Sequence, residues 1–221
     1  MKERPILFSG SMVRAILDGS KTQTRRKVSA YVPSDTSWFM THGVQATGMS
    51  HSARPTVEVP FKYGKPGDRL WVRETWYPNE PTPWYRADFI ERYQAWERDT
   101  PEGILRLEDA WKPSIHMPRW ASRLTLEIVS VRVERLQDIS EADAKAEGLK
   151  ACSKDGTLIK YGIPDMDGLP GGCDVGWPWG KWDADPRKAY RALWESINGP
   201  GSWEANPWVW VVEFKKLEVK Q

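Results

Sequence analysis

A lysine and a threonine that could act together lie near the N-terminus, in the segment 18–27, DGSKTQTRRK. Lys21 and Thr24 are three positions apart, and residues at this spacing share a face in a turn or a single helical winding, although not in a strand. Gly19 follows a short apolar helix candidate and is typical of the left-handed residue that ends a helix, which favours the turn. An amine beside a hydroxyl is either the start of an active site or a phosphate-binding corner.

Glu74 is the third candidate, because it lies in the clear strand pattern 69–76, RLWVRETW. Side chains alternate in a strand, so Glu74 shares a face with Leu70 and Val72 and points toward a core or the mouth of a cavity. A carboxylate among apolar neighbours needs a partner or a purpose, and burial raises its pKa into a range that suits proton transfer. The two interpretations are a proton-transferring group and a structural salt bridge.

Tryptophan is unusually frequent, at 14 of 221 residues, and the indole ring serves both core packing and base stacking. The segment 111–123, WKPSIHMPRWASR, mixes cations with two tryptophans. This composition is typical of a nucleic-acid contact loop, or of a buried aromatic corner with a solvated basic rim. The candidate binding residues are Ser20, Arg25 and Arg26 in the first segment, Trp71 or Trp76 as a stacking surface, and Lys112, His116, Arg119 and Trp120.

Composition limits the class of protein. The net charge is only +2, and the basic residues gather in two regions, 1–30 and 112–135. The two cysteines, Cys152 and Cys173, and the three histidines show no C-x-x-C or H-x-x-x-H spacing, so we expect no disulfide framework, no metal site and no cofactor. No apolar run has the length of a signal peptide or a membrane span, so we expect a cytoplasmic protein with no membrane partner.

Hydrophobic patterns and turn residues predict several strands and a few short helices. Strands are expected at 5–8, 69–76, 84–88, 124–136 and 207–217, and helices at 9–18, 140–148 and 185–197. The strand 124–136 should be bulged near Val129 and Ser130, where its alternation breaks. Long insertion loops are expected at about 29–62, with a short strand at 56–59, and at 89–111 and 150–184. This order, without βαβ units, predicts an α+β fold built on a compact, mostly antiparallel β-barrel with short flanking helices.

Four segments together resemble the ASCH domain, a family of the PUA-like β-barrel superfamily, in its phage- and prophage-encoded form. Gly19, Lys21, Thr24 and Arg26 occupy the positions of a G-x-K-x-x-T-x-R signature. Residues 67–74, GDRLWVRE, resemble the next strand of the family. Residues 138–148 resemble its D-I-S-x-x-D-A-x-x-E-G element, and residues 206–214 resemble its closing strand. The resemblance implies a single PUA-like domain over 1–221 that carries the three insertions.

The resemblance also implies a function. ASCH domains are expected to bind RNA in a cleft lined by the signature residues, and one branch of small members removes the acetyl group of N4-acetylcytidine. Matched to this chain, its catalytic residues are Lys21, Thr24 and Glu74. Thr24 would attack the acetyl carbon, neutral Lys21 would be its base, Glu74 would protonate the leaving amine, and the backbone N–H groups of 20–22 would hold the oxyanion.

Two alternatives stay open for the same residues. The chain could be a metal-independent ribonuclease on single-stranded RNA, in which Lys21 and Arg26 stabilise the phosphorane and Glu74 is the base. It could also be a non-catalytic RNA-binding module. In each case the expected partner is RNA or a modified cytidine nucleoside.

Overall fold

A five-stranded sheet forms the centre of the protein in the computed structural model, which describes residues 1–28, 36–41, 45–50, 57–79, 81–88, 111–164 and 176–217. The strands, in spatial order, are β1 (Glu3–Leu7), β6 (Arg69–Arg73), β9 (Thr125–Arg135), β12 (Trp208–Leu217) and β2 (Gln23–Lys27). Only β1 and β6 pair in parallel, while the other neighbours are antiparallel. The α+β class and the mostly antiparallel sheet are therefore confirmed.

The sheet is open, which corrects the expectation of a closed barrel. β1 and β2 are its two edges, and no backbone pairing joins them among the described residues. A side chain spans the gap instead, because Arg26 Nη2 of β2 donates a 2.7 Å hydrogen bond to the Leu7 carbonyl at the end of β1. The chain passes from β1 to β2 through α1 (Gly10–Leu17), so the two edges are close in sequence without being hydrogen-bonded as strands.

The two longest strands contain the predicted bulge. In the pairing of β9 with β12, Glu213 lies opposite Ser130 and Phe214 lies opposite Ile128, so Val129 is the extra residue. Val129 is half exposed, whereas Ile128 is buried. The insertion of one residue restores the apolar alternation on the core side after the break in the sequence pattern.

The helices begin and end as their capping residues predict. The Ser140 hydroxyl accepts a 3.1 Å hydrogen bond from the Asp143 backbone N–H at the start of α4 (Glu141–Ala146), and Gly148 follows that helix with a φ of 98°. Asp185 caps α5 (Pro186–Asn198), whose first residue is proline. Short 3₁₀ turns occur at Arg86–Asp88, Ser114–His116, Arg119–Ala121, Leu136–Asp138 and Trp179–Lys181.

Three small sheets extend from the centre. The first lies within the expected loop 29–62, where β3 (Thr36–Thr41), β4 (Gln45–Ser50) and β5 (Val57–Pro60) form an antiparallel meander rather than a loop with one strand. The second pairs β7 (Trp76–Tyr77) with β8 (Trp84–Tyr85), and the third pairs β10 (Lys150–Cys152) with β11 (Lys160–Gly162). Residues 89–110 and 165–175 of the other two expected insertions lie outside the described residues.

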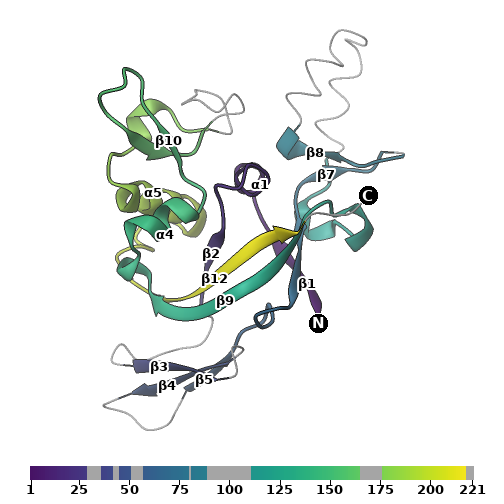
Figure 1. Ribbon diagram of the computed structural model, residues 1–221, viewed down its shortest axis with the longest axis vertical. Helices are drawn as coiled ribbons and strands as arrows, with labels where there is room; N and C mark the ends of the chain where they lie inside the picture. The colour runs from purple at the N-terminus through teal and green to yellow at the C-terminus, as the bar shows by residue number, and fades with distance from the viewer. Residues whose placement is uncertain are drawn as a thin grey trace.

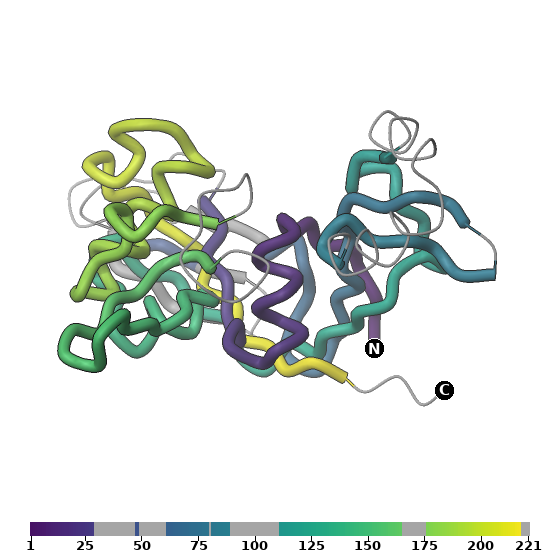
Figure 2. Tube along the Cα trace, turned by 90° about the horizontal axis from the view of Figure 1, so that it is seen from above, coloured from purple at the N-terminus to yellow at the C-terminus, as the bar shows by residue number. Residues whose placement is uncertain are grey.

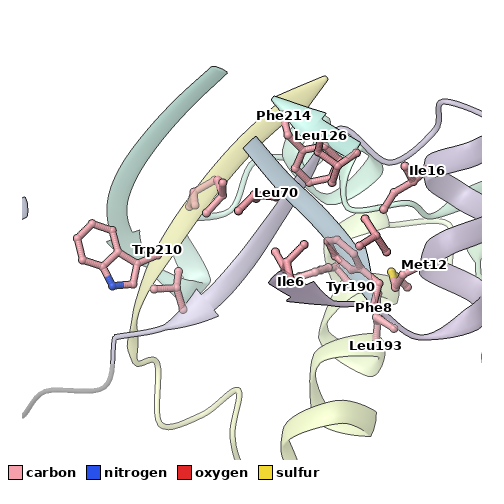
Figure 3. Close-up of a cluster of buried hydrophobic side chains, with 14 of the residues drawn as sticks. Ile6, Phe8, Met12, Ile16, Leu70, Leu126, Tyr190, Leu193, Trp210 and Phe214 are labelled. Carbon is pink, nitrogen blue, oxygen red and sulfur yellow. The ribbon is translucent and has the colours of Figure 1, made fainter. Parts of the chain in front are cut away.

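The core lies between the sheet, α1 and α5 (Figure 3). Met12 and Ile16 of α1 and Tyr190 and Leu193 of α5 belong to the same buried cluster as Leu126 in the sheet. Figures 1 and 2 show two lobes on either side of α1, one with α4, α5 and β10, and the other with β7 and β8. α1 therefore lies between segments from both halves of the chain.

Candidate active site

A cavity of about 400 Å³ lies where β2, α5 and the junction of β1 with α1 meet. This volume is within the usual range for small-molecule sites. Both lobes contribute to it, since Thr75 and Ser114 line it together with residues of α5. Its polar residues are Ser9, Lys21, Thr24, Arg25, Arg26, Lys27, Thr75, Ser114, Glu147, Tyr190 and Asn198, and its apolar residues are Leu7, Phe8, Met12, Leu193, Trp194 and Ile197.

The segment after α1 is extended, which corrects the predicted turn geometry of Lys21 and Thr24. Gly19 does take the left-handed conformation, with a φ of 81°. Lys21 then forms an isolated antiparallel bridge to Glu147, and β2 begins at Gln23. Lys21 and Thr24 both line the cavity nevertheless. The period-two rule does not separate them, because Lys21 precedes the regular strand.

Lys21 is held by Glu147, at the C-terminal end of α4. Its Nζ donates to the Glu147 carbonyl oxygen at 2.8 Å and to Oε2 at 2.9 Å, and the lysine side chain is buried. A neutral amine has two N–H bonds and one lone pair. The two hydrogen bonds to Glu147 occupy both N–H bonds of neutral Lys21 and leave its lone pair for another partner.

The surroundings of Lys21 lower its pKa and so make its neutral form more accessible. Burial lowers the pKa of Lys21 from its ordinary value of 10.5, and the nearby charges of Arg26 and Arg25 lower it further, against the opposite effect of Glu147. The ion pair with Glu147 favours the charged amine and burial favours the neutral one, and burial has the larger effect on the pKa. An amine of this kind can act as a general base.

The Thr24 hydroxyl is available for chemistry. The residue is only 3% exposed, it lines the cavity, and its hydroxyl has no hydrogen-bond partner among the described residues. A hydroxyl without such a bond, on a residue that lines a cavity, is suited to bind or attack a ligand there.

Arg25 fixes the other side of Glu147. Its guanidinium is fully buried, and it contacts Glu147 Oε1 at 3.0 Å, Glu134 Oε1 at 2.5 Å and Asp143 Oδ2 at 3.3 Å. Burial alone would lower the pKa of Arg25, but the carboxylates of Glu147 and Glu134 raise it above its ordinary value. Arg25, expected to bind substrate, lines the cavity, while its Nη1 and Nη2 atoms contact protein carboxylates.

Glu74 does not face Lys21, which corrects the expected arrangement. Its carboxylate accepts from Arg123 Nε at 2.9 Å and Nη2 at 3.0 Å, and Arg123 also contacts Asp88. Burial raises the pKa of Glu74, while the hydrogen bonds and charge of Arg123 oppose this. Glu74 is fully buried and does not line the cavity. Of its two predicted interpretations, the contacts match the structural salt bridge.

Glu147 is the site residue that the sequence did not reveal as a candidate. It lies at the end of the matched element 138–148, and this match was the available signal. Gly148 has a positive φ of 98°. A Cβ at Gly148 would lie 3.0 Å from Ala15 Cβ and 3.1 Å from Lys21 Cβ, so the helix end and the lysine are in close approach. The carbonyl groups at the end of a helix lack partners within the helix and attract cations, which explains why Lys21 is bound at Glu147.

The remaining predicted residues divide into three groups. Ser20 is engaged in the turn, with its hydroxyl 2.6 Å from Asp18 Oδ1, and it does not line the cavity, whereas Arg26 does. The backbone N–H groups of 20–22, predicted to hold an oxyanion, donate to Asp18, Ala15 and Ala146 and are therefore not available. Trp71 and Trp76 are buried, and Lys112, His116, Arg119 and Trp120 are exposed on the β7–β8 lobe.

Comparison of the chain with family models, curated proteins and solved structures finds no match. In the described ranges, no three or more His, Cys, Asp or Glu side chains are grouped in a way that could hold a metal ion. The helices within those ranges include none with the length and apolar character needed to span a membrane. Cys152 is a free thiol, and Cys173 lies outside the described residues.

Proposed function

We propose that the cavity binds a modified nucleoside of the cytidine type and hydrolyses an acetyl amide on its base. The observation that carries this proposal is the placement of Lys21, held through two hydrogen bonds by Glu147, in the same cavity as the free hydroxyl of Thr24. The catalytic residues proposed are Lys21 and Thr24. Glu147 is the carboxylate that positions Lys21, and Lys21 takes over the protonation of the leaving amine that the sequence assigned to Glu74. The resemblance of the segment 19–26 to the ASCH signature supports the choice of substrate class.

The reaction proceeds in two steps. Neutral Lys21 accepts the proton of the Thr24 hydroxyl while Thr24 Oγ1 bonds to the acetyl carbon, and the C–N bond then breaks as Lys21 returns the proton to the leaving amine. Water next attacks the acyl-threonine and passes a proton to Lys21. The Oγ1–C bond breaks as Lys21 returns this proton to Thr24 Oγ1, which regenerates the hydroxyl and the neutral amine. The acid product ionises to acetate and a proton in solvent. Glu147 keeps the amine oriented and stabilises its cationic form between the steps.

The walls of the cavity are suited to a base. Phe8, Tyr190 and Trp194 provide aromatic surface, and aromatic rings stack on nucleobases. Arg26 and Lys27 add positive charge to the same cavity, and Arg26 is the group that we assign to the developing oxyanion. Burial raises the pKa of Tyr190 well above its ordinary value of 10.0, so its hydroxyl stays protonated and serves as a donor.

Acetate release tests the proposal. The wild-type protein should convert N4-acetylcytidine to cytidine and acetate, whereas T24V should lose about 10²-fold or more in kcat and T24S should retain part of it. Chromatography of both products, with a chelator present, gives the measurement. Binding of N4-acetylcytidine without any acetate release by the wild-type protein would reassign the cavity to recognition alone. Release by T24V at the wild-type rate would remove Thr24 from the chemistry.

The pH dependence of kcat/KM should identify Lys21 as the base. Because Lys21 must lose its proton to act, kcat/KM should rise with pH through the lowered pKa of Lys21 in the free protein. In R26M a neighbouring positive charge is gone, so the pKa of Lys21 should rise and the rising limb should move to higher pH. K27M is the matched control, since it also removes a positive charge from the cavity, whereas Arg26 is a named cause of the lowered pKa of Lys21. Identical profiles for wild type and R26M would contradict the role of Lys21 as base.

A further inference from the structure

An exposed tryptophan with cations around it lies on the β7–β8 lobe. Trp120 is 70% exposed, and the neighbouring Ile115 is 56% exposed. Lys112, His116 and Arg119 on the same short segment are also exposed. We call the five residues Arg73, Lys112, His116, Arg119 and Trp120 the Trp120 surface.

Trp120 is exposed, although the segment that carries it is firmly packed. The segment contains its own small core, in which Trp76, Met117 and Ala121 are 4%, 0% and 1% exposed. The Trp120 ring meets the buried Trp76 ring edge-on, with centroids 5.7 Å apart and planes at 87°. Such a pair fixes the orientation of the indole, most of which stays exposed.

Positive charge on this surface exceeds the negative charge that faces it. Arg119 is paired with Glu3 at 3.0 Å. Arg73 instead lies 4.7 Å over the Trp71 ring, and Lys112 lies 5.8 Å over the Trp76 ring. Neither Arg73 nor Lys112 has a carboxylate within ion-pair distance in the part of the chain that the structure describes. Cations interleaved with aromatic rings suit phosphates and bases in alternation.

The Trp120 surface continues from the cavity. Ser114, on the segment that leads to Trp120, lines the cavity, as does Thr75 on the neighbouring strand end. The backbone of Lys112 pairs with that of Trp76 through hydrogen bonds of 2.8 and 3.2 Å, so the two segments run side by side. Arg73 ends β6 two positions before Thr75, so the surface has a cation close to the cavity margin.

We propose that the Trp120 surface binds a nucleotide adjacent to the one in the cavity, so that the substrate is a modified base within single-stranded nucleic acid rather than a free nucleoside. This inference rests on the proposed function for its account of the cavity. The flanking base stacks on Trp120, while Lys112 and Arg73 contact the phosphates. A duplex would keep that base paired and stacked on its own neighbours, so it would not fit.

Binding of short fluorescent oligonucleotides tests the stacking. W120A should weaken binding of a single-stranded oligonucleotide by about 5- to 150-fold, while W120F should retain most of it. The double variant R73M/K112M should lower the slope of log K against log salt by about 0.7 for each phosphate that the protein no longer neutralises. I159A is the matched control, because Ile159 is also an exposed apolar residue, at 55%, but follows β10 on the other lobe. RNA and DNA versions of the oligonucleotide identify which sugar the surface accepts.

The outcomes separate this inference from the proposed function. The kcat/KM of W120A should fall for an acetylated oligonucleotide and stay at the wild-type value for free N4-acetylcytidine. If the wild-type protein releases no acetate but binds oligonucleotides through Trp120, the proposed function is wrong and the assignment of the Trp120 surface to nucleic-acid binding is retained. If W120A binds oligonucleotides as the wild type does, or if polyglutamate competes equally well, the surface assignment is overturned whatever the cavity catalyses.

Discussion

Replacing Glu147 by glutamine should abolish acetate release, whereas replacing Glu74 by glutamine should leave the activity of the folded protein close to that of the wild type. We expect E147Q to lose about 10²- to 10³-fold in kcat, the range typical of a group that stabilises charge formed during the reaction. The amide keeps the size of the side chain but removes the charge that faces Lys21 Nζ at 2.9 Å. The lysinium formed between the two steps would then lose its counter-charge.

E74Q is the matched control, because the chemical change is identical and both carboxylates are buried. Glu74 is bound by Arg123 rather than by Lys21, so its loss should affect stability and not the chemical step. Breaking a buried ion pair on one side costs about 3–5 kcal/mol, so the activity of E74Q should be expressed per folded molecule and measured well below its melting temperature. E74D, which retains the charge, serves if E74Q does not fold.

The reverse pattern would reject Glu147 as the carboxylate of the site. An inactive but folded E74Q together with an active E147Q would return the role to Glu74. Loss of activity in both, with both folded, would show that the Arg123 cluster acts on the cavity through the β7–β8 lobe. Circular dichroism and urea unfolding of each variant establish which case applies.

Local signals in the sequence predicted the elements that depend on neighbouring residues. The caps Ser140 and Asp185, the left-handed Gly19 and the bulge at Val129 are each determined within a few positions, and the structure contains all of them. The meander within 29–62 was interpreted as a loop, because its polar and glycine-containing strands show little alternation. The open edge between β1 and β2 depends on packing across the whole chain and has no local signal.

In the candidate site, too, some features had a local signal in the sequence and others did not. Lys21 and Thr24 could be selected from one short segment, whereas Glu147 joins them over a sequence separation of 126 residues. Strand alternation predicted correctly that Glu74 points inward, but alternation cannot tell which cation a buried carboxylate will meet. Arg123 follows a segment with two prolines and no regular pattern, so its contact with Glu74 had no signal in the sequence. A long-range pair of this kind is determined by the tertiary fold.

Removing the Arg25 guanidinium should produce a large loss of stability. R25M would leave Glu147, Glu134 and Asp143 close together without the cation that they share, and we expect the free energy of unfolding to fall by about 3–5 kcal/mol. R191M is the matched control: Arg191 also contacts two carboxylates, those of Glu195 and Glu204, but its side chain is 47% exposed, and exposed pairs contribute only about 0–1 kcal/mol. Urea unfolding at neutral pH measures both variants.

The pH dependence of this loss identifies its cause. Burial raises the pKa of Asp143, but Arg25 and Arg132 more than offset this and hold it below its ordinary value of 3.8. A carboxyl group with a lowered folded pKa stabilises the protein above its unfolded pKa, and that contribution disappears as the pH falls through the folded value. The difference between wild type and R25M should therefore shrink in acid, where the carboxylates become neutral and no longer repel one another. If the difference in unfolding free energy between wild type and R25M stayed constant down to acid pH, Arg25 would stabilise the fold by packing its aliphatic stem. In that case R25K, which keeps a charge without the planar guanidinium, would be no more stable than R25M.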